Sequence, residues 1–389
     1  MRSAKEEGLI VLRELGLPVP PWFAIDPGTP EDNLKGGFEQ LGVATVSVRS
    51  GARVSMPGMM TTVLDVREED LEQAVRTVIA SWGSPRAVTY REIHGIPHDL
   101  GTSVIVQAMV FGDRDERSGS GVAFSRDPNT GERELFGEFA RQARGDVVVA
   151  GESDTLPLTE LADEHRKALA DALDRAERHY RDVCHVEFTI ESGRLWLLQV
   201  RAGGLSARAA VRVAVDLADE GLIDRAEAVR RVTPRHVRFA RTPAIRVTGA
   251  DLDVIARGRG ASPGVVTGRI AVTSEKAARM AVAGPVVLIR PHTSPQDMRG
   301  LAASAGVVTA RGGPASHAAV VARSMGKPAV VQAGVSVETS GVRVNDRTFA
   351  EGTTVTIDGT TGLIVLGEAP VTNGEIDDHL RRLLEWGES

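Results

Sequence analysis

One histidine stands where the sequence could support nucleophilic chemistry. His317 follows a run of Gly, Pro, Ala and Ser and opens a helical Ala- and Val-rich stretch, in RGGPASHAAVVARSMGKP (residues 311–328). A ring at a helix start meets unpaired backbone N–H groups and the positive end of the helix dipole. That field favours the neutral, nucleophilic ring, and the N–H groups could hold a phosphoryl group. By position alone, a histidine that merely caps a turn fits equally well.

Polar residues in the first half of the chain could bind a nucleoside triphosphate. Arg49 ends a strand-like run, VRSGA, from which its guanidinium could hold phosphate oxygens with two parallel hydrogen bonds. The run SGSG, residues 118–121, contains Gly119 and Gly121 and is predicted to be a flexible loop that covers phosphates. An exposed arginine and a glycine-serine turn are also ordinary surface features.

Glu187 and Gln199 interrupt the apolar strands of a predicted hairpin, residues 184–200. An unpaired carboxylate is costly in such a strand, so a partner is expected there. A three-residue loop, Ser192–Arg194, would place the two side chains opposite each other on one face, where they could share Mg²⁺. A two-residue loop would place them on opposite faces.

Several of these segments resemble one known family. TARGGPASHAAVVARSMGKPAVV resembles the phosphohistidine motif of the phosphoenolpyruvate-utilising enzymes. VSVRSGARVSMPGMMTTVLDV and VEFTIESGRLWLLQVR resemble the nucleotide-binding half of pyruvate phosphate dikinase, and the resemblance covers essentially the whole chain. It implies an ATP-grasp fold for the first half and a transiently phosphorylated His317 on a swivelling domain. Enzyme I of the sugar phosphotransferase system is excluded, because it has no ATP-grasp half.

The resemblance also assigns roles to single residues. Glu187 and Gln199 match the family's metal-binding positions, and Arg201 matches its phosphate-contacting arginine. Lys5 aligns with the lysine of a GGKGANL-like segment that here reads SAKEEGL, without the two glycines that precede the lysine in the family's segment. The nucleotide-binding set is therefore predicted to include Lys5, Arg49, Gly119, Gly121, Glu187, Gln199 and Arg201.

The pattern of elements predicts a mixed α/β and α+β, multidomain fold. An ATP-grasp domain is expected over residues 1–202 and a helical swivel arm over residues 203–245. A phosphohistidine domain of β/β/α type follows over residues 246–370, and a C-terminal helix over residues 371–389. Asp224 and Ser294 are expected to cap helices, the latter with Pro295 at the first helical position.

The implied reaction is stepwise. ATP and Mg²⁺ bind in the first domain, His317 attacks the β-phosphorus and AMP leaves, and phosphate or water then takes the terminal phosphoryl group. The chain ends at Ser389, about where the family's C-terminal barrel would start. Either the acceptor is therefore pyruvate bound by a separate barrel protein, or it is another small molecule or protein, or the chain is a fragment. A phosphocarrier subunit active only with a partner, and an ATP-binding module without chemistry, remain open alternatives.

Composition argues against several other classes of protein. The 389 residues carry a net charge of −6, from 46 basic and 52 acidic side chains without a basic block, which argues against a nucleic-acid partner. Cys184 is the single cysteine, so no intrachain disulfide can form. No run reaches the roughly 18 apolar residues that cross a bilayer. A cytoplasmic protein without a membrane partner is expected.

Overall fold

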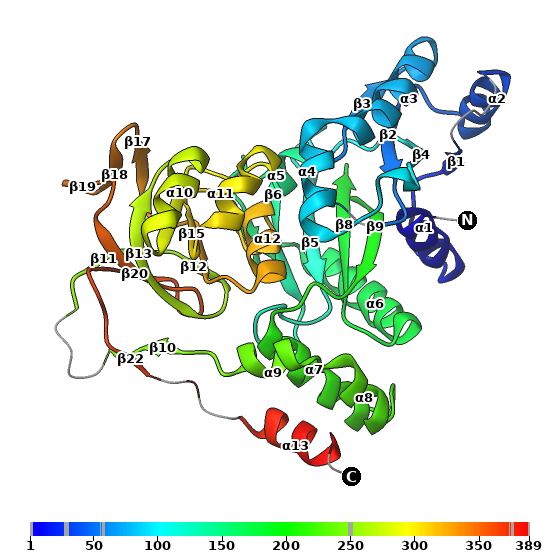
Figure 1. Ribbon diagram of the computed structural model, residues 1–389. Coiled ribbons are helices and arrows are strands. Elements are labelled where there is room, and N and C mark those ends of the chain that lie inside the picture. The colour runs from blue at the N-terminus through cyan, green and yellow to red at the C-terminus, as the bar shows by residue number, and fades with distance from the viewer. Residues whose placement is uncertain are drawn as a thin grey trace. The chain divides into compact units, whose positions relative to one another are not determined.

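The computed structural model describes residues 3–26, 31–54, 56, 59–247, 252–372, 374 and 377–387, without the side chains of residues 31, 32, 93, 94 and 149. Two compact units are formed by interleaved segments of the chain (Figure 1). Unit 1 contains Met1–Ser120, Arg141–Gly145 and Val186–Arg201, and unit 2 contains Gly121–Ala140, Asp146–His185 and Ala202–Ser389. The predicted boundaries at residues 202, 245 and 370 remain predictions, and residues 1 and 389 lie outside the described part.

Unit 1 is built on a four-stranded antiparallel sheet of order β1-β4-β2-β3. Apolar side chains on one face of this sheet pack against helices α2 and α3, and Val48 and Val106 are fully buried there. Because strand side chains alternate, Arg49 and Gln107 point to the opposite face. The elements of this part are α1 (Ala4–Glu14), β1 (Trp22–Ile25), α2 (Glu31–Leu41), β2 (Val46–Gly51), β3 (Thr62–Val66), α3 (Leu71–Ala80), α4 (Pro85–His94), β4 (Ser103–Ala108) and β9 (Arg194–Ala202).

A five-stranded sheet of order β7-β6-β5-β8-β9 follows in the chain. Its remaining strands and neighbouring helices are β5 (Gly119–Phe124), β6 (Phe136–Arg141), α5 (Gly145–Ala150), β7 (Leu156–Pro157), α6 (Asp163–Tyr180) and β8 (Cys184–Glu191). The loop after β5 is anchored by Arg126, whose buried guanidinium donates to Glu177 of α6 at 2.6 Å and to Glu220 at 2.8 Å. Cys184 is a buried free thiol.

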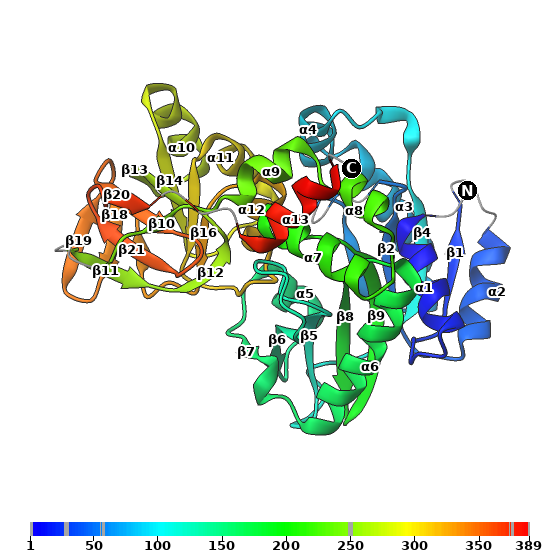
Figure 2. The ribbon, with the colours of Figure 1, turned by 90° about the horizontal axis from the view of Figure 1, so that it is seen from below.

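A helical layer in unit 2 joins two regions distant in sequence. Helices α7 (Ala207–Asp219), α8 (Arg225–Arg231) and α9 (Pro234–Ala240) share an apolar core with the C-terminal helix α13 (Asp378–Gly387), which contributes Leu380 and Leu383 (Figure 2). Asp224 caps α8 as predicted, and its carboxylate accepts from the Glu227 N–H at 2.7 Å. Strand β10 (Ala244–Ile245) leaves this layer and pairs with β22 (Val371–Thr372), so both connections to the next body lie side by side.

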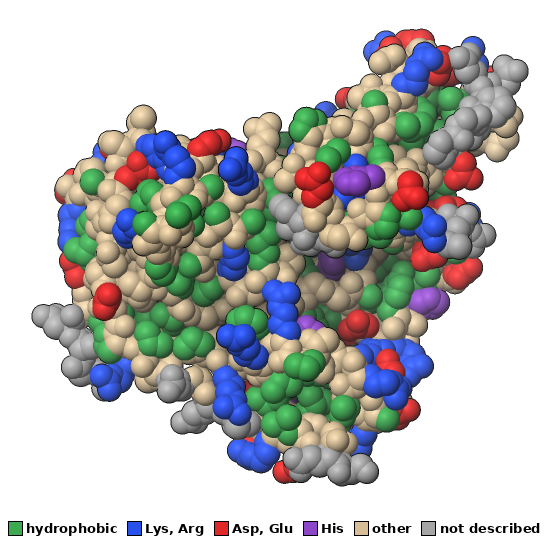
Figure 3. Space-filling view, in the orientation of Figure 1, with side chains coloured by type: hydrophobic (Ala, Val, Ile, Leu, Met, Phe, Trp, Pro, Cys, Tyr) green, Lys and Arg blue, Asp and Glu red, His purple; other side chains and the backbone are tan. Residues whose placement is uncertain are grey.

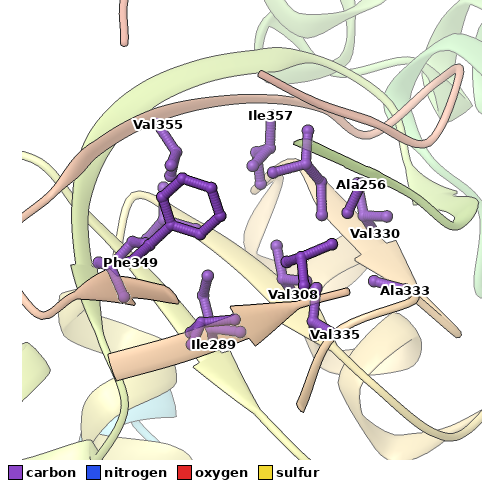
Figure 4. Packing of buried hydrophobic residues seen from close by; sticks show 14 of the residues in the cluster. Ala256, Ile289, Val308, Val330, Ala333, Val335, Phe349, Val355 and Ile357 are labelled. Carbon is purple, nitrogen blue, oxygen red and sulfur yellow. The ribbon is translucent and has the colours of Figure 1, made fainter. Parts of the chain in front are cut away.

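Residues 254–366 form two sheets and a helical layer, the predicted β/β/α arrangement. The eight-stranded sheet has the order β11-β21-β20-β13-β14-β15-β16-β12, and the small sheet has the order β17-β18-β19. Phe349 of the small sheet meets Val355, Ile357 and Ile289 in the core between the sheets (Figure 4). The helices α10 (Ser274–Met280), α11 (Met298–Ala303) and α12 (His317–Met325) contribute nothing to this core and pack on strands of the large sheet.

The strands of this body run as follows: β11 (Val254–Arg257), β12 (Arg259–Ser262), β13 (Val265–Ala271), β14 (Val286–Arg290), β15 (Gly306–Thr309), β16 (Ala329–Val331), β17 (Ser336–Glu338), β18 (Gly341–Val344), β19 (Arg347–Ala350), β20 (Thr354–Asp358) and β21 (Leu363–Leu366). The strand series β13-β14-β15-β16 is parallel, as expected where helices cross from one strand to the next. Ser294 caps the turn Pro295–Asp297 that leads into α11, in agreement with the sequence pattern.

Two observations bear on the nucleic-acid-binding and membrane-spanning classes of protein, which the sequence argues against. Both signs of charge occur across the face drawn in Figure 3. Among the helices of the described ranges, none combines the length and the apolar character that crossing a bilayer requires.

Candidate functional site

The first candidate site lies in unit 1, around the start of α1. Ser3 caps this helix by accepting from the Glu6 N–H at 3.2 Å, which places Lys5 in the first turn. Lys5 and Gln199 line one small cavity together with Arg49, which comes from the sheet face opposite the α2–α3 core. Three polar residues far apart in sequence therefore meet at one point.

The hairpin of β8 and β9 brings the predicted metal-binding pair to the same region. Its loop has two residues, Ser192 and Gly193, with φ angles of 49° and 82°, which is the shorter of the two loops that the sequence leaves open. Gln199 Nε2 nevertheless lies 3.5 Å from Glu187 Oε1. A regular two-residue hairpin would separate these side chains, so strict alternation is not kept between the turn and Gln199. Four consecutive buried residues in β9, from Leu197 to Val200, agree with this interruption.

Gln199 lies beside both Glu187 and Arg201. Turning the Gln199 amide over lets its oxygen accept from Arg201 Nη2 at 2.8 Å and from Arg201 Nε, in place of the contact from Nε2 to Glu187. Amide orientation is set by the hydrogen-bond network, and the bonds to Arg201 are the shorter ones. Glu187, Gln199 and Arg201 thus lie together in one polar cluster along the hairpin.

The charge of this cluster is shown by Lys5. Burial, together with the smaller effects of the positive charges of Arg201 and Arg49, lowers the pKa of Lys5 from 10.5 to about 7, and Glu187 opposes this shift. A lysine loses its proton this readily where cations outnumber anions and water is excluded. The cluster is therefore an electropositive, half-buried site suited to an anion.

Gly119 and Gly121 are placed differently from the prediction. Both lie inside strand β5, in which all six residues are buried, and Ser120 Oγ is 2.9 Å from Thr189 Oγ1. The predicted flexible loop over SGSG is therefore wrong. Contact of these glycines with a nucleotide remains a prediction.

The second candidate site lies in unit 2 and is built around His317. Helix α12 begins at His317, as the sequence predicts, and the side chain of its N-cap Ser316 accepts no helix N–H. The ring is 8% exposed, and its Nδ1 lies 3.2 Å from the hydroxyl of Thr293. Within the described part of the chain, Nε2 has no hydrogen-bond partner. One ring nitrogen is thus beside a hydroxyl, and the other is buried without a partner among the described residues.

Burial keeps the His317 ring neutral. It lowers the pKa of His317 from 6.5 to about 4, and the carboxylate of Asp297 partly opposes this shift. The sequence predicts a neutral ring from the helix dipole, and the structure adds desolvation as the main cause. A neutral imidazole with one free nitrogen is a competent nucleophile at neutral pH.

The loop that carries His317 is held from both sides. Glu138 of β6 is 1% exposed, and its Oε1 accepts from the Ala315 N–H at 2.9 Å. Its Oε2 accepts from Thr155 Oγ1 at 2.8 Å, and burial raises the pKa of this carboxyl. Arg323 of α12 donates through Nη1 to the Pro314 oxygen at 2.8 Å. The backbone two residues before the nucleophile is therefore fixed by a buried carboxylate.

The depressed pKa of His317 predicts a specific loss of stability in acid. The unfolded chain takes up a proton near pH 6.5, whereas the folded ring stays neutral down to about pH 4, so stability is present above pH 6.5 and falls as the pH falls. Between pH 7.5 and pH 4, the free energy of unfolding should fall by about 3 kcal/mol more in the wild type than in His317→Gln. Denaturant titrations at both pH values measure this, and equal losses would contradict it.

Sequence reasoning missed four residues of these sites. Gln107, Glu138, Thr293 and Asp297 are all at least nine-tenths buried. The available signal was a polar residue within or beside an apolar strand run, as in SVIVQA for Gln107 and LFGEFA for Glu138. No cluster of three or more His, Cys, Asp and Glu that could hold a metal occurs in the described ranges. A metal ion at Glu187 and Gln199 would need further oxygen ligands, such as phosphates or water.

Comparison with known proteins decides the family. A model of the AMP/ATP-binding domain of pyruvate phosphate dikinase matches residues 27–155 and 138–221, and a model of the mobile domain of PEP-utilising enzymes matches residues 282–362. The chain is 42% identical over 347 residues to pyruvate, phosphate dikinase of Rhizobium meliloti, covering 83% of this chain. It is 40% identical over 334 residues to that of Clostridium symbiosum, covering 82%. The chain belongs to the pyruvate phosphate dikinase family.

The two family matches correspond to the two candidate sites. The nucleotide-binding match contains Arg49, Glu187, Gln199 and Arg201, and the mobile-domain match contains His317. The predicted nucleotide-binding half and mobile domain are confirmed at this level. The chain spans 38% of the length of the two pyruvate phosphate dikinases named above. A solved D-alanyl-alanine synthetase A from Vibrio cholerae aligns at 15% identity, over 52% of this chain and 55% of the synthetase. The TM-score of 0.34 is too low to support a conclusion about this chain.

Proposed function

We propose that this protein is an ATP-dependent phosphotransferase in which His317 is the phosphoryl carrier. The observation that carries the proposal is the state of the ring: buried, neutral, with Nδ1 beside Thr293 and Nε2 without a partner in the described structure. Membership of a family with an AMP/ATP-binding domain supplies the phosphoryl donor.

The proposed first step uses Nε2 as the nucleophile. If the Thr293 hydroxyl accepts from Nδ1–H, the lone pair of the ring lies on Nε2. Nε2 attacks the β-phosphorus of ATP, the new N–P bond forms, and the bond from that phosphorus to the bridging oxygen breaks. AMP leaves with the electron pair. The ring becomes positively charged, which the nearby Asp297 carboxylate favours.

The nucleotide would bind at the unit 1 cluster. We propose that Lys5, Arg49 and Arg201 bind the phosphates and that Glu187 and Gln199 hold Mg²⁺. The surplus of positive charge that depresses the pKa of Lys5 supports the first part. The closeness of the Gln199 amide to the Glu187 carboxylate supports the second, because both groups carry an oxygen and Mg²⁺ prefers oxygen ligands. When bound, Mg²⁺ would neutralise charge on the phosphates during transfer.

Binding of the nucleotide should be coupled to proton uptake at Lys5. With a pKa of about 7, Lys5 is mostly neutral at pH 8, and bound phosphates favour its charged form. We expect uptake of about one proton per nucleotide at pH 8. Calorimetry in Hepes and in Tris, whose ionisation enthalpies differ, measures the uptake. The Lys5→Met variant should lose it and Lys35→Met, an exposed lysine of α2, should keep it; equal uptake in Lys5→Met would contradict the assignment.

The later steps are proposed from the family. Phosphate or water takes the terminal phosphoryl group, and the phosphohistidine then transfers its phosphoryl group to pyruvate or another small molecule. We propose that a separate protein with a pyruvate-binding barrel presents this acceptor. The relatives named pyruvate, phosphate dikinase support this, because they contain more chain than the matched region. A cytoplasmic location remains a prediction.

Mass analysis of the whole protein after incubation with ATP and Mg²⁺ tests the proposal. We expect an added mass of one or two phosphoryl groups that is lost in acid, together with one AMP per modified protein. Adding inorganic phosphate should convert the doubly modified form to the singly modified form if phosphate is the second acceptor. An unmodified protein with no AMP formed would overturn the proposal.

A further inference from the structure

Gln107 is a buried amide on the sheet face that carries Arg49. It lies in β4, opposite Ser47 of β2, and the pair Arg49 and Ile105 lies two residues further along these strands. Val106, which directly precedes Gln107, and Val104, on the same face as Val106, belong to the core under α2 and α3. The Gln107 side chain therefore points to the same side of the sheet as Arg49, away from that core.

The Nε2 group of the Gln107 amide is left without a partner in the described structure. The residue is 1% exposed, and its Nε2 makes no hydrogen bond to any described residue. A buried donor without an acceptor lowers stability, whereas methionine or leucine would fill the same space without that penalty. An amide at this position is explained if a group outside the chain accepts a hydrogen bond from its Nε2.

The space beside Gln107 fits such an acceptor. It is a cavity of about 10 Å³ lined by the polar residues Lys5, Arg49 and Gln199 and by the apolar residues Leu9, Ile105 and Leu198. That volume admits one water-sized group. The cations on its wall favour a negatively charged oxygen over a neutral one.

We propose that Gln107 binds the nucleotide by donating a hydrogen bond from Nε2 to a phosphate oxygen of the nucleoside triphosphate. This inference rests on the proposed function and adds a neutral donor to the cations Lys5, Arg49 and Arg201. A neutral amide positions one oxygen without a further positive charge, and its two N–H groups give direction that a lysine ammonium lacks.

Gln107→Met tests this inference, because it keeps the volume and removes the donor. Binding of Mg²⁺ with α,β-methylene-ATP, in which the proposed scissile bond cannot break, should weaken about 10- to 100-fold, as expected for a hydrogen bond to a charged group. Tripolyphosphate should lose affinity by the same factor. The melting temperature of the nucleotide-free protein should stay the same or rise, since a buried unpaired donor has been removed.

Ser47→Ala is the matched control. Ser47 is buried on the same face, and its hydroxyl already donates to the backbone carbonyl oxygen of Gln107 at 3.3 Å. Its loss should lower the melting temperature and leave nucleotide affinity unchanged. Equal affinity of wild type and Gln107→Met overturns the inference, as does a loss confined to the nucleotide with tripolyphosphate unaffected. Both results leave phosphohistidine formation intact, whereas a wild type that binds neither ligand overturns this inference and the proposed function together.

Discussion

The His317→Gln variant is expected to take up no acid-labile phosphate from ATP and to form AMP at least about 10⁴-fold more slowly than the wild type. Loss of a covalent nucleophile reduces catalysis by this order, because no other group occupies its position. Glutamine keeps the approximate length of the side chain but has no ring nitrogen to form the N–P bond. The reduced AMP formation and the absent modification must occur together if both arise from one step.

The control for this variant is a second histidine of the same body. His292 precedes Thr293 in the chain and is half-buried. His292→Gln should keep both AMP formation and the modification, and both variants should bind α,β-methylene-ATP as the wild type does, because the proposed nucleotide contacts are elsewhere. Modification of His317→Gln at the wild-type rate would assign the phosphoryl group to another residue.

Local signals made much of the fold predictable. Asp224 and Ser294 were recognised as caps because a side-chain acceptor before a helix pairs with a backbone N–H two or three residues later. The start of α12 at His317 follows from the same short-range logic. These features depend on residues within a few positions of one another, so a single sequence contains them in full.

The site residues that sequence reasoning missed depend on contacts between distant positions. Glu138 and Ala315 are 177 residues apart, and Thr293 and His317 are 24 apart. The apolar run LFGEFA around Glu138 is a local sign of a buried carboxylate, but nothing near Glu138 in the chain shows that it binds the Ala315 N–H. The sequence leaves the length of the β8–β9 loop open for a related reason: the contact of Glu187 with Gln199 depends on how the strands pair beyond the turn.

The sequence predicts the neutral state of His317 but not the main cause of its lowered pKa. The neutral state of His317 was expected from the helix dipole, which acts over one turn. The larger cause is burial, and burial is a property of the packed loop, Thr293 and the surrounding body. The pKa of Lys5 is likewise depressed first by burial and then by Arg201 and Arg49, which come from separate strands.

Gly313→Ala is expected to disrupt the loop before His317 through a single added carbon. Gly313 is not among the residues with positive φ, so its backbone accepts alanine. An added Cβ would overlap the carboxylate of Glu138, whose oxygens are already bonded to the Ala315 N–H and the Thr155 hydroxyl. We expect the free energy of unfolding to fall by about 2–3 kcal/mol, from overpacking and the loss of one of these bonds.

The same substitution should slow phosphorylation of His317 about 100-fold, since a displacement of about 1 Å in a reacting group has effects of that order. Quenched-flow measurement of acid-labile phosphate checks the rate. Gly334→Ala is the matched control, because an added Cβ at that exposed glycine meets no atom within 4 Å. It should change neither stability nor rate.

A double-mutant cycle with Glu138→Ala separates this contact from a general intolerance of the loop. Removing the carboxylate opens the space that the Cβ needs, so Gly313→Ala should be nearly neutral in the Glu138→Ala background. The coupling free energy should then be about 1–3 kcal/mol in the compensating direction. Glu138→Ala alone also removes the acceptor of the Ala315 N–H, so the double variant should phosphorylate no faster than that single variant. Additive effects on stability would mean that Gly313 is required for a reason other than the carboxylate it faces.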